Sequence, residues 1–194
     1  MKRSKLIVFT IVFAAFSFVS QSVFAQDNFK VTVENSKLTW KGYKPTGDNT
    51  GTITLTSGNI VVKNNTLSGG SFVADMSTIK DNEGNAKLEG HLKSEDFFEV
   101  AAFPTAKFDI TKSEIKGAKV YVTGNMTIKG ITKQITFPAT LAINKENVTL
   151  TSDTFQINRA DFNVKYKSKT FFNDLKDKYV NDDFDFKVTI VAKK

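Results

Sequence analysis

Histidine, the side chain whose ordinary pKa best suits acid–base chemistry near neutral pH, occurs once in the sequence, as His91. A Ser-His-Asp triad is formally possible, but no serine here lies in a motif that resembles a nucleophile elbow. A histidine-based metal site needs partner histidines or cysteines, and the sequence has neither. We therefore interpret His91 as a helix-entry residue with a structural hydrogen bond, or as a polar group at the mouth of a cavity.

Arg159 is one of two arginines in a sequence whose other cations are all lysines. Its planar guanidinium suits a fixed fork around a carboxylate, a backbone carbonyl or a ligand head group, whereas lysine serves well enough for solvation. The flanking Phe155 and Phe162 leave two interpretations open. Arg159 contacts a ligand, or it forms an ion pair with an acid such as Asp161 or Asp75.

Acidic side chains stand next to each other at residues 95–96 and 182–183. Neighbouring residues on a strand point to opposite faces, and neighbouring residues on a helix diverge. Adjacency is therefore poor evidence for a shared acid–base or metal site, and we predict neither a catalytic nor a metal-binding constellation.

The elements that must position these residues are mostly strands. From Lys37 onward, apolar and polar residues alternate with period 2, and Thr, Val and Ile are enriched, as is typical of half-buried strands. The clearest segments are residues 38–40, 53–55, 72–76, 108–110, 120–128, 135–143, 162–166 and 184–192. This pattern predicts one antiparallel barrel or sandwich, because both architectures bury one face of each strand.

Turn residues punctuate the strands. Asn-Asn at 64–65 and Lys-Gly at 129–130 predict tight connections, and Ser-Gly-Asn at 57–59 predicts a further turn. Pro138 has no N–H to donate, so its strand is predicted to lie at an edge there or to carry a bulge.

Residues 91–108 interrupt the alternation with a short helix signal. Ser94 suits an N-cap, the acids that follow suit the first turn, and Pro104 ends any helix. A second helix is predicted over residues 170–180, where apolar residues recur at near-helical spacing.

Residues 1–25 have the features of a secretory signal peptide, with cleavage expected after Ala25. The remaining residues 26–194 suffice for one domain and carry a formal net charge of +4 after three cations of the leader are removed. The sequence has no cysteine, which excludes disulfides and a lipidated cysteine anchor. We expect an exported, periplasmic or secreted protein without a stable membrane anchor and without a nucleic-acid partner. The sequence leaves open whether the protein forms a homodimer.

Thirteen of the 18 phenylalanines follow the leader. Rings without a hydroxyl group line apolar cavities well, because they add area without a polar group to satisfy. They fill ordinary protein cores equally well, so this composition does not separate the two uses.

Four stretches carry a family resemblance that runs from about Lys37 to the C-terminus. They are HLKSEDFF at residues 91–98, DMSTI at 75–79, VTGNMTIKGITK at 122–133 and FQINRADF at 155–162. In their order along the chain, these four stretches resemble the YceI-like family. The resemblance implies an all-β, lipocalin-like antiparallel barrel of about eight strands with one or two short helices, located in the periplasm.

The resemblance also implies a non-catalytic carrier that holds a polyisoprenoid or a similar amphiphile, such as a quinone or an isoprenyl phosphate, without a cofactor. The competing hypothesis is an interaction module whose barrel is filled by its own side chains. For the carrier, strand parity and motif position nominate His91 and Arg159 for the head group. The candidates for the cavity wall are Trp40, Phe72, Phe97, Phe98, Phe108, Phe137, Phe155, Phe162, Phe171 and Phe172.

Overall fold

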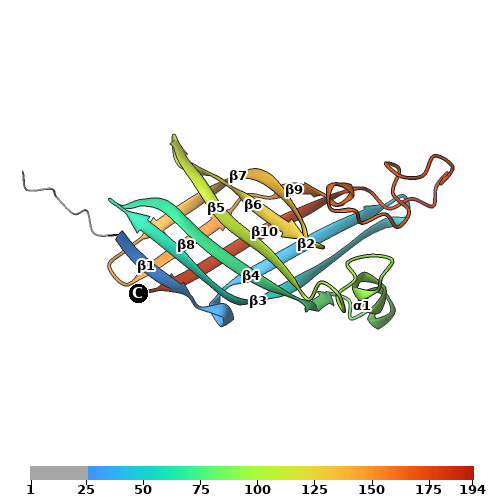
Figure 1. The fold of residues 1–194 in the computed structure, drawn as a ribbon, viewed down its shortest axis with the longest axis horizontal. Coiled ribbons are helices and arrows are strands. Elements are labelled where there is room, and N and C mark those ends of the chain that lie inside the picture. The colour runs from blue at the N-terminus through green and yellow to red at the C-terminus, as the bar shows by residue number, and fades with distance from the viewer. Residues whose placement is uncertain (1–25) are drawn as a thin grey trace, which may run out of the picture.

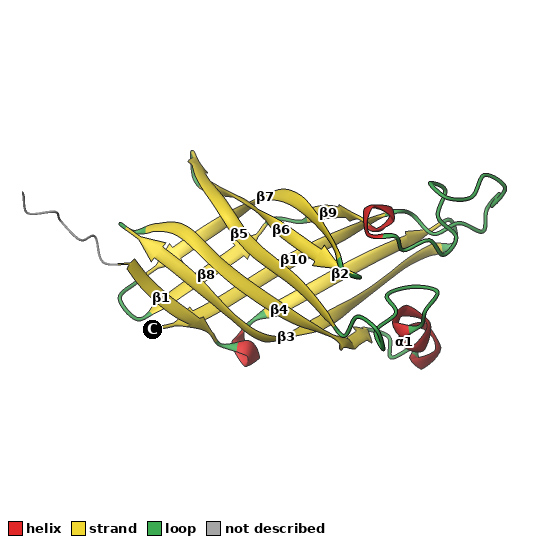
Figure 2. Cartoon of the chain, in the orientation of Figure 1, coloured by secondary structure: helices red, strands yellow, loops and turns green. Residues whose placement is uncertain are grey.

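The computed structural model describes residues 26–194, so the predicted signal peptide lies outside the described residues. The chain forms one antiparallel sheet with a short α-helix at one end (Figures 1 and 2). The strands are β1 (Gln26–Val31), β2 (Lys37–Lys44), β3 (Gly47–Lys63), β4 (Thr66–Asp81), β5 (Thr105–Lys116), β6 (Lys119–Ile128), β7 (Ile131–Ile143), β8 (Asn147–Ser152), β9 (Phe155–Asn158) and β10 (Asp183–Lys193). The helices are α1 (Ala86–Lys93) and two 3-10 turns, η1 (Val33–Asn35) and η2 (Arg159–Phe162).

The sheet closes into a ring of eight strand positions. Strands β2 to β8 pair in succession, and β10 joins both ends by pairing with β2 and β8. Strand β1 extends the position of β2 by pairing with β3 and β10, and β9 extends that of β8 by pairing with β10. Closure gives each position of the ring a partner strand on both sides over at least part of its length. The all-β, lipocalin-like barrel of about eight strands is confirmed.

The alternating residues point into one hydrophobic core, but β3 changes its parity along the way. Ile53 and Leu55 are buried in its first half, and Ile60 and Val62 in its second half. The register with β4 shifts between Leu55 and Ser57, because a bulge inserts residues and reverses which side chains face inward. The turn predicted at residues 57–59 is therefore wrong, and β3 runs on through it.

The two tight hairpin turns are confirmed. Both residues at 64–65 and at 129–130 have positive φ values, between 49° and 71°, as two-residue hairpin turns of this twist require. The prediction for Pro138 also holds, because β8 pairs with β7 only from Ala139 onward. Pro138 therefore stands where β7 loses its second neighbour.

Helix α1 precedes the segment predicted for it. Asn85 begins the helix, with its side chain accepting the Leu88 N–H at 3.0 Å, and Ser94 is the C-cap. The sequence-based N-cap at Ser94 is therefore wrong, although a short helix in this connection is correct. No α-helix among residues 26–194 is long and apolar enough to cross a membrane.

Residues 163–182, here called the mouth loop, connect η2 to β10 without regular secondary structure. The predicted helix at 170–180 and the predicted strand at 162–166 are both wrong. Asn163, Lys167 and Lys176 have positive φ values of 58°, 48° and 47°, which neither a strand nor a right-handed helix accommodates.

Glycine lets aromatic rings lie flat on the inner wall of the barrel. A Cβ atom built on Gly124 would collide with the Phe108 ring and the Asp109 carbonyl, and one on Gly51 would collide with Trp40 and the Lys80 carbonyl. These positions thus accept only glycine without rearrangement.

Candidate ligand-binding site

A cavity of about 320 Å³ opens at the end of the barrel that carries α1. Its wall combines side chains of β2, β3, β4 and β10 with α1, the segment that follows α1, and the mouth loop. Figure 1 shows α1 and the mouth loop at the same end of the barrel, opposite the β5–β6 hairpin and the C-terminus. The two connections therefore frame the entrance.

The deep wall of the cavity is apolar and largely aromatic. The Phe97 ring stacks on Phe184 with centroids 6.1 Å apart and meets Phe98 edge-on at 5.1 Å. Both arrangements are favourable for aromatic rings. The apolar lining consists of Trp40, Ile53, Ile79, Leu88, Leu92, Phe97, Phe98, Val180, Phe184 and Phe186.

Polar groups gather toward the solvent side of the cavity. The His91 ring packs edge-on against Tyr166, with centroids 4.3 Å apart, and its Nε2 lies 4.0 Å from Asp96 Oδ2. The Tyr43 hydroxyl donates to Asp185 Oδ2 at 2.5 Å, and this hydrogen bond raises the pKa of Tyr43. The remaining polar lining includes Lys44, Thr46, Asn49, Lys167, Asp177, Lys178 and Tyr179. Three lysines and one aspartate thus line the entrance, and the Asp96 and Asp185 carboxylates contact lining residues.

Glu89 fixes α1 to the end of β4. Its Oε1 accepts the Asp81 N–H and its Oε2 accepts from Lys80 Nζ, both at 3.1 Å. These hydrogen bonds, the backbone one first, lower the pKa of Glu89. Helix α1 can then present Leu88, His91 and Leu92 to the cavity from a fixed position.

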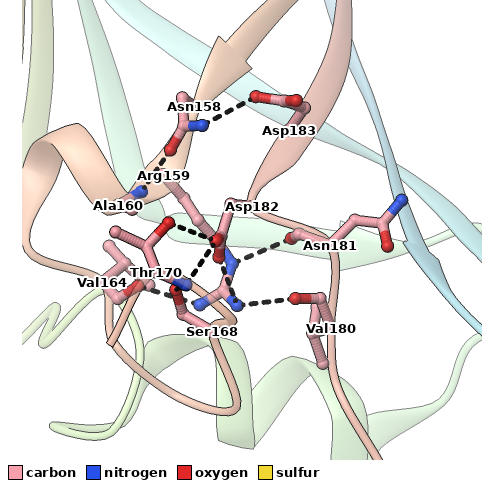
Figure 3. A network of polar contacts seen from close by, with 10 residues as sticks. All are labelled: Asn158, Arg159, Ala160, Val164, Ser168, Thr170, Val180, Asn181, Asp182 and Asp183. Carbon is pink, nitrogen blue, oxygen red and sulfur yellow. Dashed lines mark hydrogen bonds and ion pairs between the residues drawn. The ribbon is translucent and has the colours of Figure 1, made fainter. Parts of the chain in front are cut away.

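Arg159 closes the base of the mouth loop (Figure 3). Its guanidinium donates to the carbonyl oxygens of Asn181, Val164 and Val180 at 3.0, 2.8 and 2.9 Å. It also lies 3.1 Å from Asp182 Oδ1. Burial lowers the pKa of Arg159, and the Asp182 charge opposes that shift. The ion pair is thus with Asp182, and the structure places the guanidinium on the chain itself, outside the cavity lining.

Beyond the cavity, a row of aromatic side chains packs in the barrel interior. Phe137 stacks on Phe155 at 4.3 Å, Phe108 meets Phe137 at 5.5 Å, and Phe155 meets Phe186 at 6.3 Å between ring centroids. Phe186 also lines the cavity. It therefore stands where the cavity meets the row of rings.

The structure gathers some of the sequence-predicted site residues and disperses others. Trp40, His91, Phe97 and Phe98 line the cavity together. Phe72, Phe108, Phe137 and Phe162 are buried in the core, and half-buried Phe155 packs against it. Phe171 and Phe172 are 39% and 48% exposed.

Sequence reasoning missed most of the polar entrance. Tyr166 and Tyr179 reach the cavity from the irregular mouth loop, and Tyr43 and Lys44 from the end of β2. Tyrosine rather than phenylalanine was the available signal, because a tyrosine can place a ring on an apolar wall and its hydroxyl in water. Within residues 26–194, no three His, Cys, Asp or Glu side chains are grouped to hold a metal ion.

Comparison with known proteins agrees with this architecture. The YceI-like domain model matches residues 16–192. Protein YceI of Salmonella arizonae is 40% identical over 57 residues, which are 29% of this chain and 30% of that protein. The match thus spans less than a third of the length of such curated relatives.

Three solved structures share the fold. BcnA of Burkholderia cenocepacia has a TM-score of 0.71 at 23% identity, covering 84% of this chain and 99% of that one. A polyisoprenoid-binding domain from Saccharophagus degradans has a TM-score of 0.66 at 15% identity, covering 85% and 97%. The Campylobacter jejuni YceI protein has a TM-score of 0.54 at 18% identity, covering 100% and 99%. With the domain model spanning nearly the whole chain and the barrel shared with these structures, the protein belongs to the YceI-like family.

Proposed function

We propose that this protein is a non-catalytic carrier that sequesters an isoprenoid-like amphiphile in the cavity at the α1 end of the barrel. The apolar tail lies among Phe97, Phe98 and Phe184, and the head group lies at the entrance near His91. The observation that carries this proposal is the cavity itself, a hollow with an aromatic floor and a polar rim that includes three lysines. The polyisoprenoid-binding domain among the structural neighbours supports the same ligand class.

The charges at the entrance favour an anionic head group. Lys44, Lys167 and Lys178 line the opening, with Asp177 as the only acid among the lining residues. Ammonium groups attract phosphate as point charges. An isoprenyl phosphate therefore suits the entrance better than a neutral quinone does.

The cavity volume limits the length of tail that it encloses. About 320 Å³ is near the lower end of the ~300–1,000 Å³ that is usual for small-molecule pockets. The packed rings of Phe137, Phe155 and Phe186 block further passage along the axis. We propose a short-chain isoprenoid, or a longer one whose far end emerges at the entrance.

A binding role needs no reacting group, and the surroundings of His91 suit a binding role. Its ring contacts Tyr166 and Phe97, with only the distant Asp96 carboxylate beside it. The driving force is burial of the tail, worth roughly 0.8 kcal/mol per methylene. We place this activity in the periplasm, reached through cleavage after Ala25.

The test uses the single tryptophan as its reporter, because Trp40 lines the cavity. Gly42 also lines the cavity, and a Cβ atom there would lie 3.5 Å from Phe184 in ordinary contact. Gly42→Leu should therefore obstruct the cavity without straining the backbone. We expect a short-chain isoprenyl phosphate to change Trp40 fluorescence in the wild type and not in Gly42→Leu.

Gly90→Leu is the matched control, since Gly90 is exposed on α1 and a Cβ there meets nothing within 4 Å. It should bind like the wild type. Native mass spectrometry of protein purified without detergent should also show a co-purifying amphiphile. A wild-type mass that stays free of ligand with isoprenyl phosphates and quinones alike would refute the carrier.

That negative result would favour the second candidate, an interaction module with a self-filled barrel. The observation on its side is the continuous row of rings from Phe108 through Phe137 and Phe155 to Phe186. Under this alternative, Gly42→Leu would raise stability by filling a void and would change no binding.

A further inference from the structure

Two adjacent phenylalanines of the mouth loop face solvent. Within the described part of the chain, the exposed large apolar side chains are Phe171, Phe172 and Ile115. Phe171 and Phe172 stand at the cavity end, whereas Ile115 stands in β5 beside the β5–β6 hairpin at the opposite end (Figure 1). Two exposed rings side by side indicate an interaction site, whereas a single exposed apolar residue is ordinary.

The loop holds the two rings outward by an ordered turn. The N–H groups of Phe171 and Phe172 both donate to the Ser168 carbonyl, at 3.2 and 3.0 Å. Thr170 donates through its N–H and its hydroxyl to Asp182 Oδ2, at 3.2 and 2.8 Å (Figure 3). Ser168 is fully buried. The turn is therefore anchored to the same Asp182 that faces Arg159, and the exposure of the rings is built into the fold.

The loop that carries the two rings is rich in lysine. Residues 165–179 contain five lysines and two aspartates, which leaves a net charge of +3. Lys165 Nζ lies 5.3 Å from the centroid of the Phe171 ring, and Lys169 Nζ lies 3.4 Å from that of Tyr179. Within residues 26–194, none of these five lysines forms an ion pair. Their charge is free to meet an external anion.

We propose that the mouth loop docks on an anionic lipid bilayer, with Phe171 and Phe172 in the interface and the lysines against the head groups. Aromatic rings and flexible cations together are what a bilayer surface binds. The same loop supplies Tyr166, Lys167 and Tyr179 to the cavity. Docking would turn the entrance toward the membrane, so that an amphiphile passes between bilayer and cavity without crossing water. Only this last step rests on the proposed carrier function.

The test is co-sedimentation of the protein, in the form that its cells produce, with vesicles. We expect binding to vesicles that contain phosphatidylglycerol, weaker binding to phosphatidylcholine alone, and a decline as salt rises. Phe171→Ser/Phe172→Ser should lower the partition coefficient on the order of tenfold for each ring. Ile115→Ser, which removes the most exposed apolar side chain, should leave it unchanged.

A second readout locates the contact. The fluorescence of Phe172→Trp should be quenched by brominated lipid, and that of Ile115→Trp should not. Binding that survives the double substitution, or falls equally with Ile115→Ser, would overturn the proposal. A change of oligomeric state on double substitution without vesicles would assign the face to a second copy of the chain instead.

The Trp40 titration with a short-chain isoprenyl phosphate separates this proposal from the carrier function. The double variant should bind that ligand normally, because neither ring lines the cavity. Vesicle binding without binding of isoprenyl phosphates or quinones would refute the carrier alone, and ligand binding without vesicle binding would refute docking alone.

Discussion

Arg159 illustrates how one side chain can look like a ligand contact and serve the fold. Its guanidinium meets three carbonyl oxygens from two ends of the mouth loop and faces Asp182, while its side chain is almost fully buried. The Phe97 ring lies 5.4 Å from the guanidinium carbon, so the same group contacts the cavity wall from behind. We regard Arg159 as a positioning residue for the entrance.

Arg159→Met should therefore lower the free energy of unfolding by roughly 3–5 kcal/mol, because it leaves Asp182 and three carbonyl groups buried without their partner. Urea denaturation followed by circular dichroism would measure the loss. Asp182→Asn in both backgrounds completes a double-mutant cycle, and we expect the two losses to be clearly less than additive. Additive losses would mean that the two side chains act independently.

The sequence showed that Arg159 needs a fixed fork but not which acceptors fill it. The candidates Asp161 and Asp75 were near in sequence or in motif, whereas the observed partners include Val180, Asn181 and Asp182, which return from the far end of a long loop. Contacts of this kind depend on the path of a loop without period 2 or period 3.6. Local pattern carries no information about that path.

At the scale of elements, periodicity predicted the strands well because a closed barrel buries one face of each strand. Periodicity failed where side-chain hydrogen bonds and residues with positive φ values set the backbone conformation. In the mouth loop, Phe171, Phe172 and Leu175 repeat at nearly helical spacing, yet the two phenylalanines face solvent. The apolar spacing there belongs to a solvent-exposed surface and not to the buried face of a helix.

Helix α1 is tied to the barrel by one carboxylate. The pKa of Glu89 is lower in the folded protein than its ordinary value of 4.5, chiefly through the Asp81 N–H. Its stabilising contribution is thus complete above the unfolded-state pKa and is lost as the pH falls through the folded-state pKa. The charged form is the one that holds the helix.

We therefore expect Glu89→Gln to lower the unfolding midpoint at neutral pH and to flatten the acid limb of the stability profile below about pH 4.5. Thermal unfolding at a series of pH values would show both effects. Glu95→Gln, at an exposed position beyond the helix, should leave the profile as it is. A constant difference between Glu89→Gln and wild type down to strongly acidic pH would contradict the role of the charge.

At the scale of the whole molecule, the barrel is divided along its length. Strand parity identifies which rings face inward, but not the height at which each ring lies along the axis. Height follows from strand tilt and register, which the barrel sets as a whole. This is why parity alone could not separate Trp40, which lines the cavity, from Phe108 and Phe137, which face inward elsewhere along the axis. Phe97 and Phe98 lie in the segment after α1, where strand parity does not apply.

The division makes stability and binding separable. Phe137 is 3% exposed and stacks on Phe155, so Phe137→Ala should cost roughly 3–5 kcal/mol of unfolding free energy. Because Phe137 lies outside the cavity lining, the folded fraction should bind ligand with unchanged affinity.

Leu92→Ala, in the cavity wall, should instead weaken binding by removing tail contacts. Urea denaturation and the Trp40 titration, run on both variants, would test this. If Phe137→Ala weakened binding as much as Leu92→Ala does, the tail would have to extend through the whole barrel.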